Sequence, residues 1–137
     1  MKKVYINIAV KNLDSSVEFY KALGFEKQED FSDENGVGMK WSNEIFVMLL
    51  THDFAKNFIE DRAFANSHEV FSSLFSFELE SVQEVDKIVE KAKSVNARTF
   101  KNKINEQFDF MYGTSIVDPD GNILEMFYMD TSKFPSK

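Results

Sequence analysis

Apolar and polar residues alternate near both ends of the chain. From residue 4 to residue 10 every second position is Val or Ile, and residues 122–129 alternate in a similar way. Because successive side chains of a strand face opposite sides of a sheet, this period of two predicts a strand in each segment. Further apolar runs predict strands at residues 25–31, 37–41, 45–50, 71–79, 98–102 and 108–117.

Two other segments repeat their apolar residues every three or four positions, which is the period of a helix. The first leads to Leu23 and the second to Val95. Ser15 and Ser81 each precede a Glu by three residues, a capping-box pattern that starts a helix, and Asp14 is a competing cap for the first. We therefore predict one helix in each half of the chain.

The order of one strand, one helix and three strands thus occurs twice. The two modules are expected at residues ~4–51 and ~70–129, and a helical connector at residues ~52–66 joins them. A helix covers one face of each sheet and leaves the opposite face to line a hollow. The predicted fold class is α+β, with residues 1–137 as a single domain in which two βαβββ modules form a cupped mixed sheet with the helices on the outer face.

Composition narrows the classes of function. The chain has 137 residues, 43% of them hydrophobic, and a net charge of −7 with scattered lysines, which argues against nucleic-acid binding. It has no cysteine, and this excludes disulfides, Cys-ligated zinc and a thiol nucleophile. It also lacks a run of ~18 apolar residues and the apolar stretch of a signal peptide. We expect a cytoplasmic protein with no membrane partner.

The sequence Asp118-Pro119-Asp120-Gly121 predicts a tight turn before the last strand. Proline fixes φ at the first corner, and the glycine can adopt a positive φ. Beyond the turn, strand alternation places Glu125 among apolar residues in the middle of the strand. Burying an unpaired carboxylate is costly, so Glu125 needs a hydrogen-bond partner, a proton or a metal ion.

Two segments resemble the vicinal oxygen chelate superfamily, which includes glyoxalase I, extradiol dioxygenases and the bleomycin- and fosfomycin-resistance proteins. Residues 10–25 are similar to the first-helix motif of that superfamily, with Asn12 where it usually has Asp, and residues 118–125 are similar to its closing turn and strand. The resemblance implies the two-module fold. It does not specify a reaction, because this scaffold supports many chemistries.

Metal-dependent members of that superfamily take one ligand from the first and one from the last strand of each module. The resemblance implies Glu125 as one such ligand. By their own chemistry, Glu125 as a general base and Tyr5 as a proton acceptor are the candidate catalytic residues. The remaining positions fall on Tyr5, near Leu74, and on Val47 or Met48, which are poor ligands for a transition metal. A divalent metal at Glu125 is therefore an expectation with an incomplete ligand set.

We expect the hollow to bind a small organic ligand, because it combines apolar walls with a few polar groups. Tyr112 lies in the last hairpin, where it is expected to close over the mouth of the hollow. If Glu125 faces inward, alternation adds to its surface Tyr5, Asn7, Ala9, Val47, Leu49, Leu74, Ser76, Glu78 and Phe127.

Three readings of this site are open. The first is a binding protein similar to the metal-free resistance members. The second is a metal-dependent lyase or dioxygenase that uses Glu125 with His52, Tyr5 or Glu78. The third is a scaffold with a filled hollow, in which Glu125 is paired with a buried hydroxyl or amide such as Tyr5, Asn7 or Tyr112.

Residues outside the strands add two expectations. His52 and His68 are interpreted as surface histidines. Aromatic side chains at residues 54, 58 and 64 are expected either to cover the hollow or to form the contact of a homodimer, an assembly that the resemblance also implies.

Overall fold

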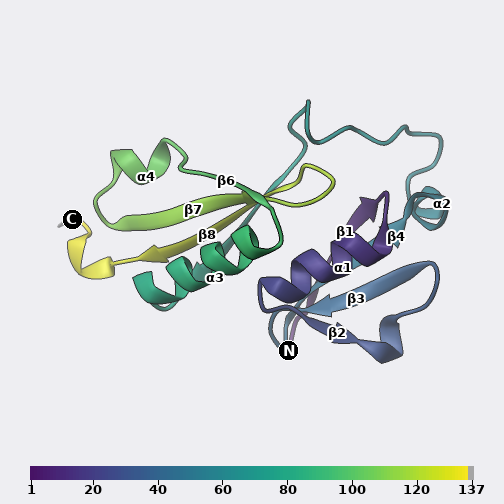
Figure 1. Cartoon of the computed structure of the whole chain (residues 1–137), viewed down its shortest axis with the longest axis horizontal. Helices are drawn as coiled ribbons and strands as arrows, with labels where there is room; N and C mark the ends of the chain where they lie inside the picture. Colours follow the sequence, from purple (N-terminus) through teal and green to yellow (C-terminus); the bar gives the residue numbers. More distant parts are fainter. Residues whose placement is uncertain (136–137) are drawn as a thin grey trace.

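The computed structural model describes residues 1–135, so the last two residues of the predicted domain lie outside the described part. Two four-stranded mixed sheets form, with strand orders β1-β4-β3-β2 and β5-β8-β7-β6, which confirms the predicted α+β class (Figure 1). The first sheet consists of β1 (Val4–Val10), β2 (Glu26–Gln28), β3 (Gly36–Lys40) and β4 (Ile45–Thr51). The second consists of β5 (Leu74–Leu79), β6 (Arg98–Phe100), β7 (Met111–Val117) and β8 (Ile123–Met129).

The two predicted helices are α1 (Leu13–Ala22) and α3 (Val82–Ser94), and both lie in front of the strands in Figure 1. Ser81 caps α3 as predicted, accepting a 3.1 Å hydrogen bond from the backbone N–H of Glu84. The cap predicted for α1 was wrong. Asn12 accepts the hydrogen bond from the backbone N–H of Ser15, because its short amide side chain competes well for the first free donors of a helix.

Some element boundaries differ from the prediction for local reasons. β2 ends at Gln28, because residues 29–31 form a 3₁₀ turn that carries Phe31 over β3. A Cβ built on Gly38 would lie 3.0 Å from the Cβ of Phe31, so the glycine makes room for this turn. The short helix α4 (Ile104–Gln107) was not predicted, since four residues are too few to show a helical period.

The hydrophobic core lies between the helices and the sheets and runs through both modules. Phe25 of the first module packs edge-on against Phe77 of the second, with 5.7 Å between ring centroids, and Trp41 contacts the same ring at 4.9 Å. Both helices therefore cover the same side of the molecule. We call the opposite sheet faces, turned away from α1 and α3, the distal face.

The connector between the modules begins with the short helix α2 (His52–Ala55) and then crosses to the turn between β7 and β8. Its backbone at Ser67 and His68 lies directly against Gly121, where a Cβ would come within 2.3 Å of the His68 nitrogen. Gly121 also has a φ of +92°, as the turn prediction required. Among residues 1–135 no helix is long and apolar enough to cross a membrane.

Candidate functional site

Strand register places Glu125 on the distal face. In β8 it lies opposite Ser76 of β5 on one side and Ser115 of β7 on the other. Its neighbours Leu124 and Met126 point the other way, into the helix-covered core. The predicted apolar neighbours of Glu125 along the strand are confirmed. The residues beside it on its own face, however, carry hydroxyl groups.

Glu125 is a buried and fully paired carboxylate, with 7% of its surface exposed. Ser76 Oγ donates a 2.8 Å hydrogen bond to Oε1, and Asn102 Nδ2 donates one of 2.9 Å to Oε2. Asn102 is itself held in place, because its Oδ1 accepts the backbone N–H of Asn105 at 3.1 Å. Two separate segments, β5 and the residues after β6, therefore donate to one carboxylate and fix its orientation.

The predicted partners of Glu125 were Tyr5, Asn7 or Tyr112, and the structure gives it Ser76 and Asn102 instead. Ser76 was assigned to this surface as a ligand-binding residue, and its strand position is as expected. Asn102 was missed. It follows β6, and only the pairing of β6 with β7 brings it beside Ser115 and Glu125, so no local sequence signal marks it.

Val47 and Leu49 were predicted on the same surface as Glu125, and this placement was wrong. Parallel pairing of β1 with β4 sets Tyr5 opposite Phe46 and Ile8 opposite Leu49. Val47 and Leu49 thus share the face of the core and are only 1% and 0% exposed. Phe46 occupies the distal face instead, where its ring stacks on Tyr5 with 4.9 Å between centroids.

Tyr112 was also placed on the wrong face. Tyr112 of β7 pairs with Tyr128 of β8. Tyr128 lies three positions after Glu125, so the two residues point to opposite faces of the sheet, and the side chain of Tyr112 lies on the helix-covered side. There its hydroxyl donates a short hydrogen bond to Asp86 of α3, and the Lys101 ammonium lies 4.8 Å from its ring centroid. Tyr112 ties α3 to the sheet and does not close over the distal face.

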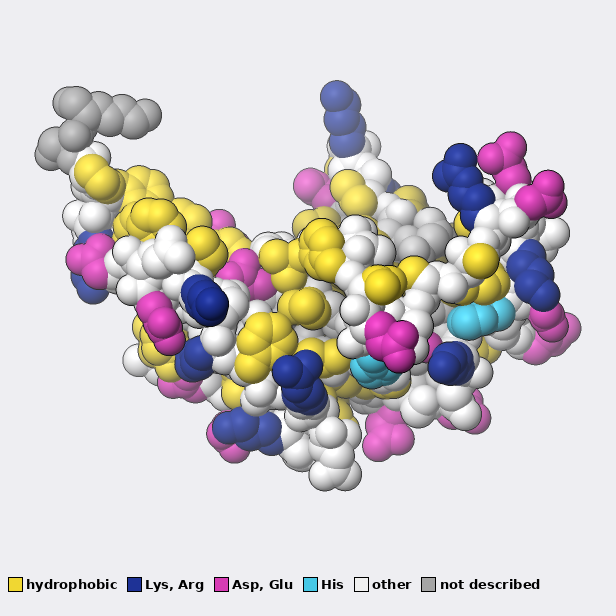
Figure 2. Space-filling view, turned by 90° about the horizontal axis from the view of Figure 1, so that it is seen from above, with side chains coloured by type: hydrophobic (Ala, Val, Ile, Leu, Met, Phe, Trp, Pro, Cys, Tyr) yellow, Lys and Arg dark blue, Asp and Glu magenta, His cyan; other side chains and the backbone are white. Residues whose placement is uncertain are grey.

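The other predicted site residues have strand positions on the distal face, namely Tyr5, Asn7, Leu74, Ser76 and Phe127. Tyr5 is 43% exposed and Leu74 is 46% exposed. Figure 2 shows hydrophobic side chains along a dip in the surface, beside the segment that follows β8. This surface thus combines exposed apolar side chains with the polar cluster around Glu125.

The donor set around Glu125 does not fit a transition metal held by one chain. A catalytic site of that kind takes about three nitrogen, oxygen or sulfur ligands from the protein. Around Glu125 the polar neighbours are a serine hydroxyl and an asparagine amide, which already donate to its two oxygens. Within residues 1–135 no group of three His, Cys, Asp or Glu side chains lies close enough to hold a metal ion.

A cavity of about 340 Å³ lies apart from Glu125, between the end of β1, the connector and the turn of β7 and β8. Both histidines line it. His52 packs its ring on Phe64 at 4.3 Å between centroids, and His68 Nε2 lies 3.1 Å from the carbonyl oxygen of Pro119. His68 is exposed as interpreted from the sequence, whereas His52 is partly buried.

Asp120 belongs to the same cavity and comes from the tight turn. Its Oδ1 accepts the backbone N–H of Lys11 at 3.0 Å, and its Oδ2 lies 3.5 Å from the hydroxyl of Ser16. Burial raises the pKa of Asp120, and the bond from Lys11 offsets only part of this effect. The carboxylate therefore fastens the turn of the second module to the first.

Comparisons with known proteins agree with this architecture. A family model described as the glyoxalase/bleomycin resistance protein/dioxygenase superfamily matches residues 3–126. No protein among those with curated descriptions matches the chain.

Several solved structures share the fold. The hypothetical protein SA1046 from S. aureus superposes with a TM-score of 0.72 at 21% identity, over 93% of this chain and 94% of its own. A glyoxalase/bleomycin resistance protein/dioxygenase family enzyme from Burkholderia phytofirmans PsJN gives 0.72 at 18% identity, over 95% and 100%. The oxidase ChaP-H2 gives 0.67 at 14% identity, over 95% and 94%. With the family model spanning nearly the whole chain, the protein belongs to the glyoxalase/bleomycin resistance protein/dioxygenase superfamily.

Proposed function

We propose that the protein binds a small organic ligand on its distal face, anchored by Glu125. The observation that carries this proposal is the buried carboxylate held by Ser76 and Asn102 in the floor of an exposed apolar surface. A fixed, desolvated acceptor beside apolar walls is the usual composition of a small-molecule site. The family assignment supports a ligand-binding role of this kind but leaves the ligand open.

The site favours a ligand that donates hydrogen bonds. An ionised carboxylate has about four lone-pair positions, and the two hydrogen bonds to Glu125 use two of them. A ligand hydroxyl, amine or amide N–H can therefore be received by Glu125. The exposed Leu74 and the stacked rings of Tyr5 and Phe46 offer contact area for an apolar or aromatic body.

We propose that a second copy of the chain covers the distal face in a homodimer. A single chain leaves several large apolar side chains open to solvent, and a surface of this kind marks an interaction site. They include Tyr5 and Leu74 at distal-face strand positions, and Phe31, which lies beside Gly38 of β3. Light scattering coupled to size-exclusion chromatography tests the assembly. A mass of twice the 15.9 kDa chain supports it, and a monomer at all concentrations contradicts it.

The alternative is a metal-dependent lyase or dioxygenase in which Glu125 is a metal ligand and Tyr5 an acid or base. It requires further ligands that one chain does not gather in its described residues, so a partner copy would have to supply them. Elemental analysis of protein purified without chelators tests it. Stoichiometric metal that is lost in Glu125→Ala supports this alternative over metal-free binding.

The cysteine-free composition agrees with a cytoplasmic location for either function.

A thermal-shift screen tests the ligand proposal. The compounds are small aromatic amines, phenols and amides, and their apolar parent compounds serve as negative controls. We expect stabilisation of the native protein by the donors, because a ligand that binds only the folded state raises its melting temperature. Glu125→Gln should abolish the shift while keeping the shape of the side chain.

Glu78→Gln is the matched control. It makes the same change of charge on β5, next to Ser76 and on the same face, at an exposed position. The proposal requires that Glu78→Gln retain the ligand-induced shift. Equal loss in both variants would mean that the compounds respond to the net charge of the protein and not to Glu125.

A further inference from the structure

The cavity beneath the connector is a second site, which borders the distal face at Asn7 and Ala9. Its walls come from the end of β1, from α2, from the connector and from the turn at Asp120, and neither Glu125 nor Ser76 belongs to them. At about 340 Å³ it lies within the range of small-molecule sites. Phe64 and Phe75 supply apolar wall, and serine and asparagine side chains of the connector supply polar groups.

The charge of this cavity has the opposite sign to that of the protein. The whole chain carries a net charge of −7, with 23 acidic and 16 basic residues. Among the described residues that line the cavity, by contrast, Asp120 is the single acid. Four basic side chains accompany it: Lys11, His52, Arg62 and His68.

The single acid is already engaged by the fold. Asp120 accepts the backbone N–H of Lys11 and faces the hydroxyl of Ser16, so its two oxygens are directed to the first module. It therefore locks the turn in place, and the charge interaction with His52 also lowers the pKa of Asp120. Lys11 and Arg62 have no further acid among the described residues that line the cavity. A bound anion would supply one.

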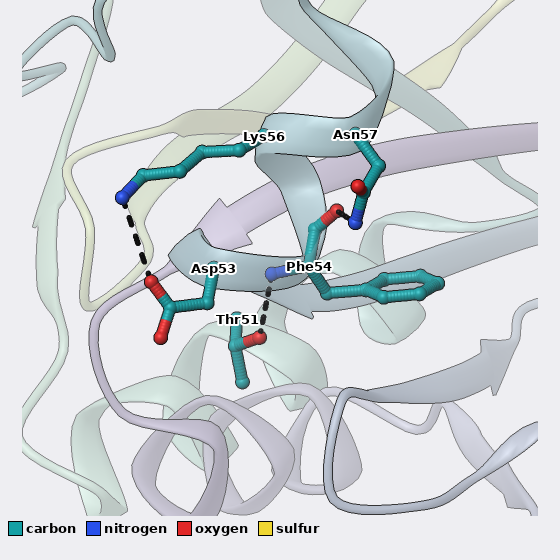
Figure 3. A network of polar contacts seen from close by, with 5 residues as sticks. All are labelled: Thr51, Asp53, Phe54, Lys56 and Asn57. Atoms are coloured by element: carbon teal, nitrogen blue, oxygen red, sulfur yellow. Dashed lines mark hydrogen bonds and ion pairs between the residues drawn. The ribbon is translucent and has the colours of Figure 1, made fainter.

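Arg62 and His52 are the two side chains best able to receive that anion. The ion pair of Arg62 with Glu60 spans 3.7 Å, and both side chains are at least 80% exposed, so it holds the guanidinium only weakly. His52 is better fixed. Thr51 caps α2 through a 3.2 Å hydrogen bond from the backbone N–H of Phe54 (Figure 3), and the ring of Phe64 packs against the imidazole at a tilt of 36°.

We propose that this cavity binds a small organic anion, a monocarboxylate with an aromatic or other apolar body. The carboxylate lies between Arg62 and His52, since a guanidinium and an imidazole N–H both donate to carboxylate oxygens. The body of the ligand packs against Phe64 and Phe75. This ligand class has the opposite hydrogen-bonding character to the donor ligand proposed for Glu125, so the two sites can be distinguished by chemistry.

The experiment is a titration of the full chain with benzoate at pH 7, followed by the backbone amide signals in ¹H–¹⁵N NMR spectra. We expect saturable shifts at residues 52, 62–68 and 120–122. Benzamide, which has the same shape without the charge, should bind at least about tenfold more weakly, because a charge-assisted hydrogen bond is worth roughly that factor.

Two variants and one control complete the test. Arg62→Gln and His52→Gln should each weaken benzoate binding by about three- to tenfold. Lys56→Gln makes the same charge change as Arg62→Gln beside the same connector, but Lys56 does not line the cavity and pairs with Asp53 at 3.5 Å (Figure 3). It should bind benzoate as the native chain does.

Four results would overturn the proposal. The first is benzoate binding that is not saturable at millimolar concentrations. The second is equal affinity for benzoate and benzamide. The third is unchanged affinity in the variant that carries both Arg62→Gln and His52→Gln. The fourth is a set of shifts centred on Ser76 and Glu125, which would assign benzoate to the distal face instead.

Discussion

Tyr20 donates a 2.8 Å hydrogen bond to Asp118, a residue 98 positions further along the chain. The first belongs to the helix motif and the second to the tight turn, so the two segments that carry the family resemblance touch each other. Asp118 Oδ1 also accepts the backbone N–H groups of Asp120 and Asn122 at 2.9 and 2.8 Å. These motifs hold the two modules together. Their presence in the sequence therefore indicates the fold and does not indicate a reaction.

Tyr20→Phe should lower the free energy of unfolding by about 1–3 kcal/mol, because it removes the phenolic donor and leaves a buried carboxylate oxygen of Asp118 with one partner fewer. Urea denaturation at pH 7 measures this difference. A change below 0.5 kcal/mol, roughly that of an ordinary surface substitution, would show that the bond does not join the modules.

The same variant has a signature at high pH. Burial, reinforced by the charge of Asp118, raises the pKa of Tyr20 well above its ordinary value of 10.0. Above that value the unfolded chain loses the proton while the folded chain keeps it, so this tyrosine lowers stability as pH rises. We expect Tyr20→Phe to lose less stability than the native protein between pH 9 and pH 11.

Asn102→Ala should weaken binding on the distal face as well as the fold. It removes the donor to Glu125 Oε2 and should cost about 1–3 kcal/mol of unfolding free energy. Asn57→Ala is the matched control, because the Asn57 amide donates only to the nearby Phe54 carbonyl at an exposed position (Figure 3). Equal stability of the two variants would contradict the role assigned to Asn102.

Two glycines allow the stability cost of backbone strain to be distinguished from the cost of a clash with the connector. Gly24 and Gly121 both have positive φ, +100° and +92°. A Cβ on Gly24 meets nothing within 4 Å, whereas one on Gly121 would collide with the backbone of residues 67 and 68. Gly24→Ala should lower the free energy of unfolding by about 1–2 kcal/mol, which is the usual cost of placing a residue with a side chain in the left-handed conformation.

Gly121→Ala should cost more than Gly24→Ala and should also open the connector to limited proteolysis near His68. The measurements are urea denaturation and mapping of the first cleavage site by mass spectrometry. If both variants lose the same stability and remain equally resistant, the connector does not rest on the turn in solution.

Asp120→Asn tests the charge buried in the turn. The pKa of Asp120 is raised from 3.8, chiefly by burial. An acid whose folded-state pKa is raised binds more protons when folded, so its contribution favours the folded state at low pH and is lost as pH rises. The stability of the native protein minus that of Asp120→Asn should therefore fall between pH 4 and pH 7. A difference that rises with pH would contradict this.

The two-module fold could be predicted because period-two and helical patterns are strong in β1, α1 and α3, where one face is buried and the other is not. Side-chain placement failed in β4, which runs Ile-Phe-Val-Met-Leu-Leu. Apolar residues on both faces of a strand leave no alternation to fix its phase, so Val47 and Leu49 were assigned to the wrong side.

The contacts of the site depend on pairings that are distant in sequence. Asn102 reaches Glu125 only because β6 pairs with β7, and Tyr112 turns to Asp86 only because its position pairs with Tyr128. The connector has no regular spacing of apolar residues. The sequence pattern therefore could not predict the cavity that the connector forms with His52 and Asp120. Tertiary packing decides these features, and local propensity does not.

The most direct test of the central claim is to map the strongest hit of the thermal-shift screen onto the chain by the amide signals of a ¹H–¹⁵N NMR titration. Binding at the Glu125 cluster predicts saturable shifts centred on Ser76, Asn102 and Glu125 that disappear in Glu125→Gln and persist in Glu78→Gln. Shifts confined to the connector cavity, or shifts that survive Glu125→Gln unchanged, would contradict it.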